Sequence, residues 1–409
     1  MTTSMDSMPT NILQINREDP FSADVLDDPS AFHERLRDAG EVVYLEPYGV
    51  YAMGRYATVH AALTNWQQFI SSAGVGLSNF RREAPWRPPS LLLEADPPAH
   101  SASRTTLAKI LSPRSLRAYA PVWQAEAERH VEELLERAIG GVLEFDAVPE
   151  LTEAFPLRVF PDAVGLERQG REHLLPYGDY VFNAFGPRNF LVEAGAPDVG
   201  VHAAWIASQC ERERLDPAGI GAAVWAAADH GDITEQQAPL IIRSILTAGV
   251  DTTIHALSSV FHALANAPLQ WAALRTDPSL ARRAFDEAIR LESPVQTFFR
   301  TAEGDVSIGG VTVPDGEKIL MFLGSANRDP RHWDDPDEFD LSRDPSGHVG
   351  FGMGVHQCVG QHVARLEATA LLKALTRRVR SITPAGPIRR HLNNTLHATA
   401  ALPLRFELL

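Results

Sequence analysis

A short run near the end of the chain places a cysteine between closely spaced glycines and the start of an amphipathic helix. It reads Phe351-Gly352-Met353-Gly354-Val355-His356-Gln357-Cys358-Val359-Gly360. A helix beginning at about Val359 directs its free N–H groups and positive dipole end at the sulfur of Cys358, which favours a thiolate. The glycines let the backbone approach a flat, bulky group. A buried cysteine acting as a small hydrophobic residue is the common alternative, but it leaves the glycines and the histidine unexplained. The pattern indicates a thiolate that binds a metal.

The same run matches the loop Phe-Gly-x-Gly-x-His/Arg-x-Cys-x-Gly that binds haem in the cytochrome P450 superfamily, and it fills every fixed position. Further motifs follow the order of that superfamily from about Asp19 to the C-terminus, so the chain resembles its soluble bacterial members. The resemblance implies a mainly α fold with a minor β part, formed by one large haem domain over residues 1–409. It also implies haem b with Cys358 as axial thiolate ligand. The loop residues expected to contact the haem are Phe351, Gly352, His356 and Gly360.

Composition and charge are those of a globular protein. The chain has 409 residues, of which 44% are hydrophobic, and no linker-like or low-complexity stretch divides it, so one large domain is expected. Residues 1–18 are expected to be disordered or loosely packed. The net charge of −15 and the pI near 5.4 argue against a nucleic-acid-binding protein.

The sequence also indicates a compartment. Its N-terminal residues lack the basic and apolar regions of a signal peptide. The most apolar stretch, residues 238–267, is interrupted by Arg243, Asp251 and two histidines, which argues against a membrane span. The two cysteines, Cys210 and Cys358, are far apart in sequence, so a disulfide framework is not expected. These features predict a soluble protein of the reducing cytoplasm.

Hydrophobic periodicity predicts helices over most of the chain and short strands near its two ends. The region between Pro98 and Ala302 is mainly helical in pattern. The individual predictions are helices at residues 30–39 and 123–138, strands at 41–45, 50–53, 306–308 and 318–322, and a last helix after Cys358 followed by strands.

Residues 234–266 form the longest predicted helix, with Thr234 as its N-cap. Its middle, Ala248-Gly249-Val250-Asp251-Thr252-Thr253, contains residue types that weaken a helix interior. Thr252 is expected to donate a hydrogen bond to the carbonyl of Ala248, which bends or opens the helix and leaves a groove for dioxygen. A helix kink without a chemical role is the alternative for these residues taken alone.

The superfamily that the chain resembles carries this signature on the distal side of its haem. The resemblance therefore implies that Ala248 and Gly249 contact the cofactor. It also implies that Asp251 relays protons and that the hydroxyl of Thr252 assists oxygen activation. These two residues are the predicted catalytic pair.

Two haem carboxylates partly removed from water need cations or hydrogen-bond donors nearby. The resemblance assigns this role to His100, Arg104, Arg300 and His356. For any one of these residues alone, an ordinary surface role would be the default.

Glu287 and Arg290 have the spacing of an ordinary surface ion pair on one helix face, worth about 0.5 kcal/mol or less. The superfamily's Glu-x-x-Arg motif lies at the same place and is buried, where it supports the cysteine loop. A basic third partner is frequent before that loop, but residues 337–339 are Asp-Glu-Phe. The third partner is therefore left unassigned.

A set of aromatic, basic and hydroxyl residues is expected around the substrate pocket. The set is Arg87, Ser90, Phe182, Phe185, Arg243, Ser244, Thr247, Val295 and Phe298. Phenylalanine faces suit a planar ring, and Arg87, Ser90 and Ser244 suit a carboxylate. The alternative for the phenylalanines is an ordinary place in the core.

The strings at residues 86–90, 182–187 and 293–300 also resemble the bacterial P450 subgroup that oxidises para-substituted benzoates such as 4-methoxybenzoate. The resemblance implies that one oxygen atom of the co-substrate O2 enters the para substituent, by hydroxylation or by oxidative O-demethylation. Thr247 stands where serine occurs in that subgroup, and its additional methyl group narrows the pocket.

No flavin or nicotinamide fingerprint occurs in the sequence. Electrons are therefore expected from a two-iron two-sulfur ferredoxin and its NAD(P)H-dependent reductase. Candidates for a basic docking patch are Arg81, Arg82, Arg104 and Arg365, and scattered solvated charges are the alternative.

Two other functions stay open. A peroxide-driven peroxygenase typically lacks the acid and alcohol pair, and a non-catalytic haem sensor needs neither a proton relay nor a carboxylate clamp.

Overall fold

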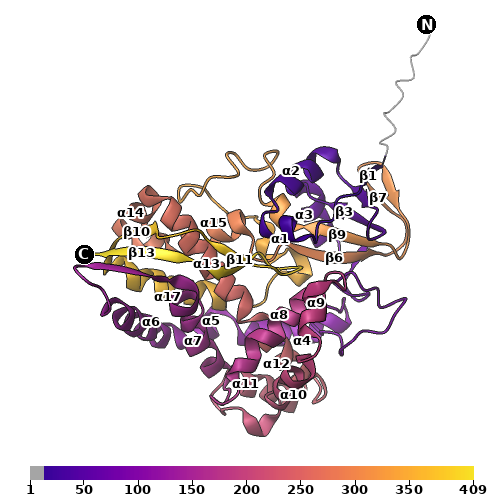
Figure 1. The fold of residues 1–409 in the computed structure, drawn as a ribbon. Coiled ribbons are helices and arrows are strands. Elements are labelled where there is room, and N and C mark those ends of the chain that lie inside the picture. The colour runs from indigo at the N-terminus through magenta and orange to yellow at the C-terminus, as the bar shows by residue number, and fades with distance from the viewer. Residues whose placement is uncertain (1–12) are drawn as a thin grey trace.

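The computed structural model describes residues 13–409, and it has the mainly helical architecture with minor sheets that the sequence predicts (Figure 1). The helices of the N-terminal half are α1 (Ala23–Asp27), α2 (Ser30–Ala39), α3 (Tyr56–Thr64), α4 (Ala99–Ile110), α5 (Pro113–Leu116), α6 (Tyr119–Leu135), α7 (Ala154–Val164), α8 (Leu174–Asn183), α9 (Phe190–Gly195) and α10 (Val199–Ser208). Those that follow are α11 (Ile220–Asp229), α12 (Gln237–Ala248), α13 (Asp251–Asn266), α14 (Pro268–Thr276), α15 (Ala281–Glu292), α16 (Leu323–Ala326) and α17 (Gln361–Thr376).

The strands form one larger and several smaller sheets. They are β1 (Gln14–Asn16), β2 (Val43–Leu45), β3 (Val50–Met53), β4 (Phe69–Ile70), β5 (Val142–Asp146), β6 (Thr297–Ala302), β7 (Val306–Ile308), β8 (Val311–Val313), β9 (Lys318–Phe322), β10 (Val379–Pro384), β11 (Arg389–His391), β12 (Ala398–Ala401) and β13 (Pro403–Leu408). The larger sheet has the order β1-β2-β3-β9-β6-β4 within residues 13–409. β9 pairs in parallel with β3 and antiparallel with β6, which sets Arg300 opposite Ile319.

The helical core is built around α13, whose apolar residues pack on several sides. Leu257, Val260, Phe261 and Leu264 of this helix are fully buried. α13 contacts α8 and α15, and α15 in turn contacts α17, the helix that follows the cysteine loop. This packing fixes α13 and the cysteine loop relative to each other.

The long helix predicted over residues 234–266 is two helices, because α12 ends at Ala248 and α13 begins at Asp251. The hydroxyl of Thr252 donates to the carbonyl of Ala248 at 2.7 Å, as expected. Thr234 accepts a hydrogen bond from the backbone N–H of Gln237 at 3.3 Å, as an N-terminal cap does.

Residues 237–266 are long and apolar enough to cross a membrane, yet more than half of their most apolar window is buried inside the fold, as in a core helix.

Three local predictions differ from the structure. Strand β5 interrupts the region predicted as helical, because Gly140 and Gly141 turn the chain with φ of +61° and +78° and β5 then pairs with β13. The last helix begins at Gln361 rather than Val359. Of the first 18 residues, 1–12 lie outside the described residues, whereas Gln14–Asn16 form an edge strand on β2 in place of a disordered segment.

Candidate active site

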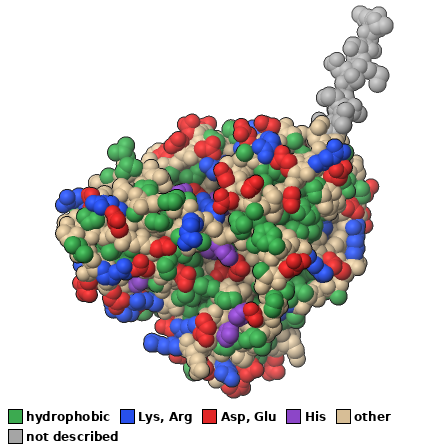
Figure 2. Space-filling model, viewed as in Figure 1, with side chains coloured by type: hydrophobic (Ala, Val, Ile, Leu, Met, Phe, Trp, Pro, Cys, Tyr) green, Lys and Arg blue, Asp and Glu red, His purple; other side chains and the backbone are tan. Residues whose placement is uncertain are grey.

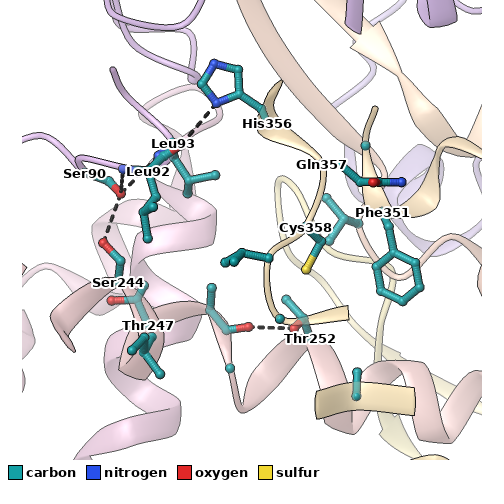
Figure 3. A pocket seen from close by; sticks show the side chains of 18 of the residues that line it. Ser90, Leu92, Leu93, Ser244, Thr247, Thr252, Phe351, His356, Gln357 and Cys358 are labelled. Carbon is teal, nitrogen blue, oxygen red and sulfur yellow. Dashed lines mark hydrogen bonds between the residues drawn. The ribbon is translucent and has the colours of Figure 1, made fainter. Parts of the chain in front are cut away.

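A large internal cavity separates the break between α12 and α13 from the cysteine loop (Figure 3). Its empty volume is about 1720 Å³, counting the opening to solvent. Side chains from α4, α7, α8, α12, α13, α15 and β6 complete the lining, most of it apolar. The cavity therefore lies between the two motifs that the sequence singled out, the Cys358 loop and the break at Thr252.

Cys358 faces the cavity from the loop, and its backbone N–H donates to the carbonyl of Phe351 at 2.7 Å. Burial raises the pKa of the Cys358 thiol, while the N–H of Gly360 and the charges of Arg104 and Arg365 act in the opposite direction. The N–H groups at the start of the following helix act in the predicted direction, but desolvation outweighs them, so the pKa of the thiol is raised and not lowered. A bound metal ion is what would hold this sulfur deprotonated.

Two loop glycines adopt conformations that other residues avoid. Gly352 and Gly354 both have φ of +65°. A Cβ atom on Gly354 would lie 2.7 Å from the carbonyl oxygen of Leu63 in α3. Gly354 is therefore required both by its backbone conformation and by the close approach of α3.

The predicted catalytic pair lies where the long helix is broken. Thr252 lines the cavity, and Asp251 is buried behind it against α8. Burial raises the pKa of Asp251 well above its usual value, and the nearby carboxylates of Asp179 and Glu153 raise it further. A carboxyl group in this environment favours its protonated form, so it can donate a proton to a neighbour. Ala248 and Gly249 line the cavity beside Thr252.

The four residues predicted to bind haem carboxylates gather at one side of the cavity. Arg104, Arg300 and His356 line it, and the His100 ring packs on His356 with centroids 4.6 Å apart. Nε2 of His100 is buried without a hydrogen-bond partner among the described residues. Arg300 donates to the carbonyl of Phe299, and burial lowers its pKa to about 10. A partly desolvated cation of this kind favours a bound anion.

Asp96 was not singled out in the sequence, but it anchors this group of residues. It accepts hydrogen bonds from the backbone N–H groups of Ser71 and Ser72, and its Oδ1 lies 3.3 Å from Nε2 of His356. Although burial opposes ionisation, these bonds lower the pKa of Asp96 to about 2. An ionised Asp96 fixes the orientation of the His356 ring.

All of the predicted substrate-contacting residues line the cavity. Phe185 lies between Phe182 and Phe298, with ring centroids 5.9 Å from each. The hydroxyls of Ser90 and Ser244 are 3.0 Å apart, and Arg243 donates to the carbonyl of Pro88 at 2.7 Å. Thr247 donates to the carbonyl of Arg243, which turns its methyl group away from that bond. Val295 completes the lining.

Glu287 and Arg290 form a fully buried ion pair with bonds of 2.8 and 2.9 Å. Their third partner is Arg343, whose Nε lies 3.1 Å from Glu287. Arg343 comes four residues after Phe339, beyond the acidic stretch where a base was sought. Arg290 also donates to the carbonyls of Asn327 and Pro336, so the pair ties α15 to the segment before the cysteine loop.

Comparison with known proteins agrees with this geometry. The sequence profile of the cytochrome P450 family matches residues 222–407. The chain is 54% identical over 387 residues to cytochrome P450 CYP199A2 of Rhodopseudomonas palustris, which covers 95% of this chain and 93% of that protein. The chain therefore belongs to the cytochrome P450 family, and it is a monooxygenase with a haem-thiolate cofactor.

Solved structures place it more closely within that fold. The structure of CYP109Q5 from Chondromyces apiculatus is similar with a TM-score of 0.79 and 28% identity, over 96% of this chain and 99% of that chain. Cytochrome P450 CREJ in complex with (4-ethylphenyl) dihydrogen phosphate is similar with a TM-score of 0.82 and 25% identity, over 95% of this chain and 98% of that chain. The mainly helical fold with minor sheets is thus confirmed.

The residues of the cavity fit a haem. A cysteine sulfur faces the space, and a Cβ atom on Gly360 would lie 3.9 Å from that sulfur. Arg104, Arg300 and Nε2 of His100, which has no hydrogen-bond partner among the described residues, offer donors to carboxylates. The bound cofactor supplies the oxygen-activating chemistry of the family.

Proposed function

We propose that this P450 monooxygenase oxidises a small aromatic carboxylic acid at the substituent para to the carboxylate, by hydroxylation or by oxidative O-demethylation. The supporting observation is the polarity of the cavity. Ser90, Ser244 and Thr247 lie on one side of the cavity, and Cys358 and Thr252 lie on the other (Figure 3). Arg87 and Arg243 line the same end as the two serines.

The polar end has the donors that a carboxylate requires. The hydroxyls of Ser90 and Ser244 are 3.0 Å apart, close enough for both to donate to one carboxylate. The guanidinium groups of Arg87 and Arg243 supply positive charge beside them. The ring of the acid would then lie against Phe182, Phe185 and Phe298, which exclude water and direct the para position toward Cys358.

A relative supports this combination of ring and anion. Cytochrome P450 CREJ was solved with (4-ethylphenyl) dihydrogen phosphate, which carries an anionic group para to a small alkyl substituent. The carboxylate preference itself is argued from the residues of this chain.

The same proposal gives Asp251 and Thr252 a role in proton delivery. Asp251 is a buried acid whose raised pKa favours the protonated form, and Thr252 lines the cavity while its hydroxyl donates to the carbonyl of Ala248. Asp251 would supply the proton, and the Thr252 hydroxyl would pass it into the cavity that Cys358 also lines. Substrate in the pocket would exclude other water from this step.

The carboxylate clamp is tested with the substitution Arg87→Ala. Binding of 4-methoxybenzoate and of its neutral analogue 4-methoxybenzamide is measured by titration of the haem-loaded protein. We expect the acid to lose about 100-fold in affinity and the amide about twofold or less, because only the acid uses the charge. Arg82→Ala is the matched control, since Arg82 lies nearby in sequence and pairs with Glu317 at the surface. Equal losses for acid and amide would contradict the clamp.

Electrons are proposed to come from a two-iron two-sulfur ferredoxin and its reductase in the cytoplasm. The arginines considered for docking do not form a free basic patch. Arg81 and Arg82 are paired with Glu303 and Glu317, Arg365 is paired with Asp286, and Arg104 faces the cavity. On the face in Figure 2, acidic and basic side chains are interspersed. Docking would therefore use mixed charges and not one basic cluster.

The rival functions give different results. A peroxygenase would form product with hydrogen peroxide alone, at a rate equal to the rate with ferredoxin, reductase and O2. A haem sensor would show no coupled product formation when reductant is supplied. We expect product with 4-methoxybenzoate only when ferredoxin and reductase are supplied.

A further inference from the structure

A buried carboxylate lies behind the polar end of the cavity, and the proposed reaction does not use it. The side chain of Glu94 is 4% exposed, and its Oε2 is 3.3 Å from Nη1 of Arg87, which is itself 11% exposed. The same oxygen accepts a hydrogen bond from the backbone N–H of Ser90 at 2.7 Å. Arg87 and Ser90 line the cavity, while Glu94 stands one layer behind them. Every polar contact of Glu94 is thus with a residue of the clamp.

The charges that face this end can be counted. Arg87 and Arg243 contribute two positive charges, and Glu94 contributes one negative charge. Cys210 lies near Arg243 and is neutral in this setting, since burial raises its pKa to about 12. The clamp therefore has a net charge of one positive unit.

The other cations nearby make their hydrogen bonds elsewhere, although the charge of Glu94 acts to raise the pKa of Lys318. The amine of Lys318 donates to the carbonyls of Ala73 and Gly74, and burial lowers its pKa to about 7. Arg104 and Arg300 are at the side of the cavity assigned to the haem carboxylates. None of these three carries a hydrogen bond to the clamp within residues 13–409.

We propose that Glu94 sets the clamp to accept one carboxylate and to reject two, which makes the enzyme selective for monocarboxylic acids. This inference rests on the proposed function. One bound carboxylate neutralises the net charge of the clamp, and a second would remain uncompensated in a partly desolvated site next to Glu94. Without the Glu94 charge, the two arginines would compensate both carboxylates.

The test separates charge from size with two ligands of nearly equal shape. 4-Methoxyphthalate carries a second carboxylate beside the first, and 4-methoxy-2-nitrobenzoate carries an uncharged nitro group at that position. Dissociation constants are measured by calorimetry on the haem-loaded protein at pH 8. For the unaltered enzyme we expect the dicarboxylate to bind about 100-fold more weakly than the nitro acid.

The substitution Glu94→Gln removes the charge and keeps an oxygen that can accept from the Ser90 N–H. We expect the ratio of the two dissociation constants to fall about tenfold or more in this variant. Glu94→Asp keeps the charge and should retain most of the discrimination. Glu83→Gln is the matched control, because Glu83 is an exposed acid of the same region, paired only distantly with Arg188, and it should leave the ratio unchanged.

Each outcome has one meaning. If the unaltered enzyme binds 4-methoxybenzoate no better than 4-methoxybenzamide, the proposed function is wrong. If it prefers the acid but E94Q leaves the ratio unchanged, the role of Glu94 is wrong and the proposed function stands. Should E94Q fail to fold, the same fall in the ratio is expected for E94A. If the two ligands have nearly equal dissociation constants in the unaltered enzyme, the inference is wrong whatever the variants show.

Discussion

Asp251 is an acid whose surroundings raise its pKa and favour the protonated form, which gives it a testable pH dependence. The substitution Asp251→Asn keeps the shape and removes the proton. We expect product formation to fall about 100-fold, the usual size of a general-acid contribution, with substrate affinity unchanged. In the unaltered enzyme, turnover should decline as pH rises through the elevated pKa of Asp251, because the ionised form has no proton to give. Rates across the pH range in which both proteins stay folded check this, and a parallel decline in D251N would contradict it.

Thr252 lines the cavity while its hydroxyl is bonded to the carbonyl of Ala248. In Thr252→Ala we expect reductant consumption to continue while product per reductant falls about tenfold, because the proton is then delivered by poorly placed water. Ser259→Ala is the matched control. Its hydroxyl makes the same bond to the carbonyl four residues earlier, at 2.8 Å, but it is buried away from the cavity. Equal loss of coupling in both variants would indicate a helix effect and not a proton-delivery effect.

At the scale of elements, the ion-pair network on α15 contains one carboxylate and two guanidinium groups. Glu287 holds both Arg290 and Arg343, so removing Glu287 leaves two cations in a buried site, whereas removing Arg343 leaves a neutral pair. We expect Glu287→Gln to cost about 3–5 kcal/mol of unfolding free energy and Arg343→Ala about 1–2 kcal/mol.

Chemical denaturation, together with haem content, measures these costs. Arg328→Ala removes an exposed partner of Asp337 and should cost about 0.5 kcal/mol or less. Similar losses of unfolding free energy for E287Q and R343A would show that the number of unpaired charges does not govern the stability of this network.

The contact between α8 and α13 depends on a glycine. A Cβ atom on Gly178 would lie 1.7 Å from Oδ2 of Asp251, so either the acid or α8 must move. We expect Gly178→Ala to cost about 1–3 kcal/mol of unfolding free energy and to lower the rate of product formation. Gly200→Ala in α10 meets nothing within 4 Å and should be neutral or stabilising by up to about 1 kcal/mol. Denaturation of the two variants side by side gives the comparison, and equal effects would contradict the contact.

For the whole molecule, buried neutral histidines set the response to acid. Burial lowers the pKa of His33 and of His348 to about 3 in the folded protein, against about 6.5 in the unfolded chain. Between these values the unfolded chain binds more protons, so stability falls as pH falls from about 6.5 toward 3. The loss is about 1.4 kcal/mol per pH unit for each histidine.

Urea denaturation at pH 7, 6 and 5 measures the slope of the unfolding free energy against pH. His33→Leu should flatten it, because one of the titrating groups is then absent. His230→Gln, at an exposed residue, should leave it unchanged. A slope in H33L equal to that of the unaltered protein would contradict the assignment.

Much of the fold follows from the sequence because local signals were strong. The helix at 30–39 and the strands at 50–53 and 318–322 have the predicted bounds, since turn residues and alternation mark their ends. Cys358, Thr252 and the pocket residues meet in one cavity because the motifs lie on elements that the fold packs together. Arg343 and Glu94 could not be found in this way. Each is recognised only by what it contacts in the folded protein, and a single sequence does not show these contacts.

The pairing of β3 with β9 has a consequence for how the protein is made. The larger sheet joins strands from residues 14–70 to strands from residues 297–322. During synthesis β3 and β4 therefore emerge long before their partners β9 and β6, and the ribosome must pass Phe322 before the sheet can close. The cysteine that receives the cofactor is translated later still, so we expect nascent chains stalled before residue 322 to be protease-sensitive and unable to retain haem.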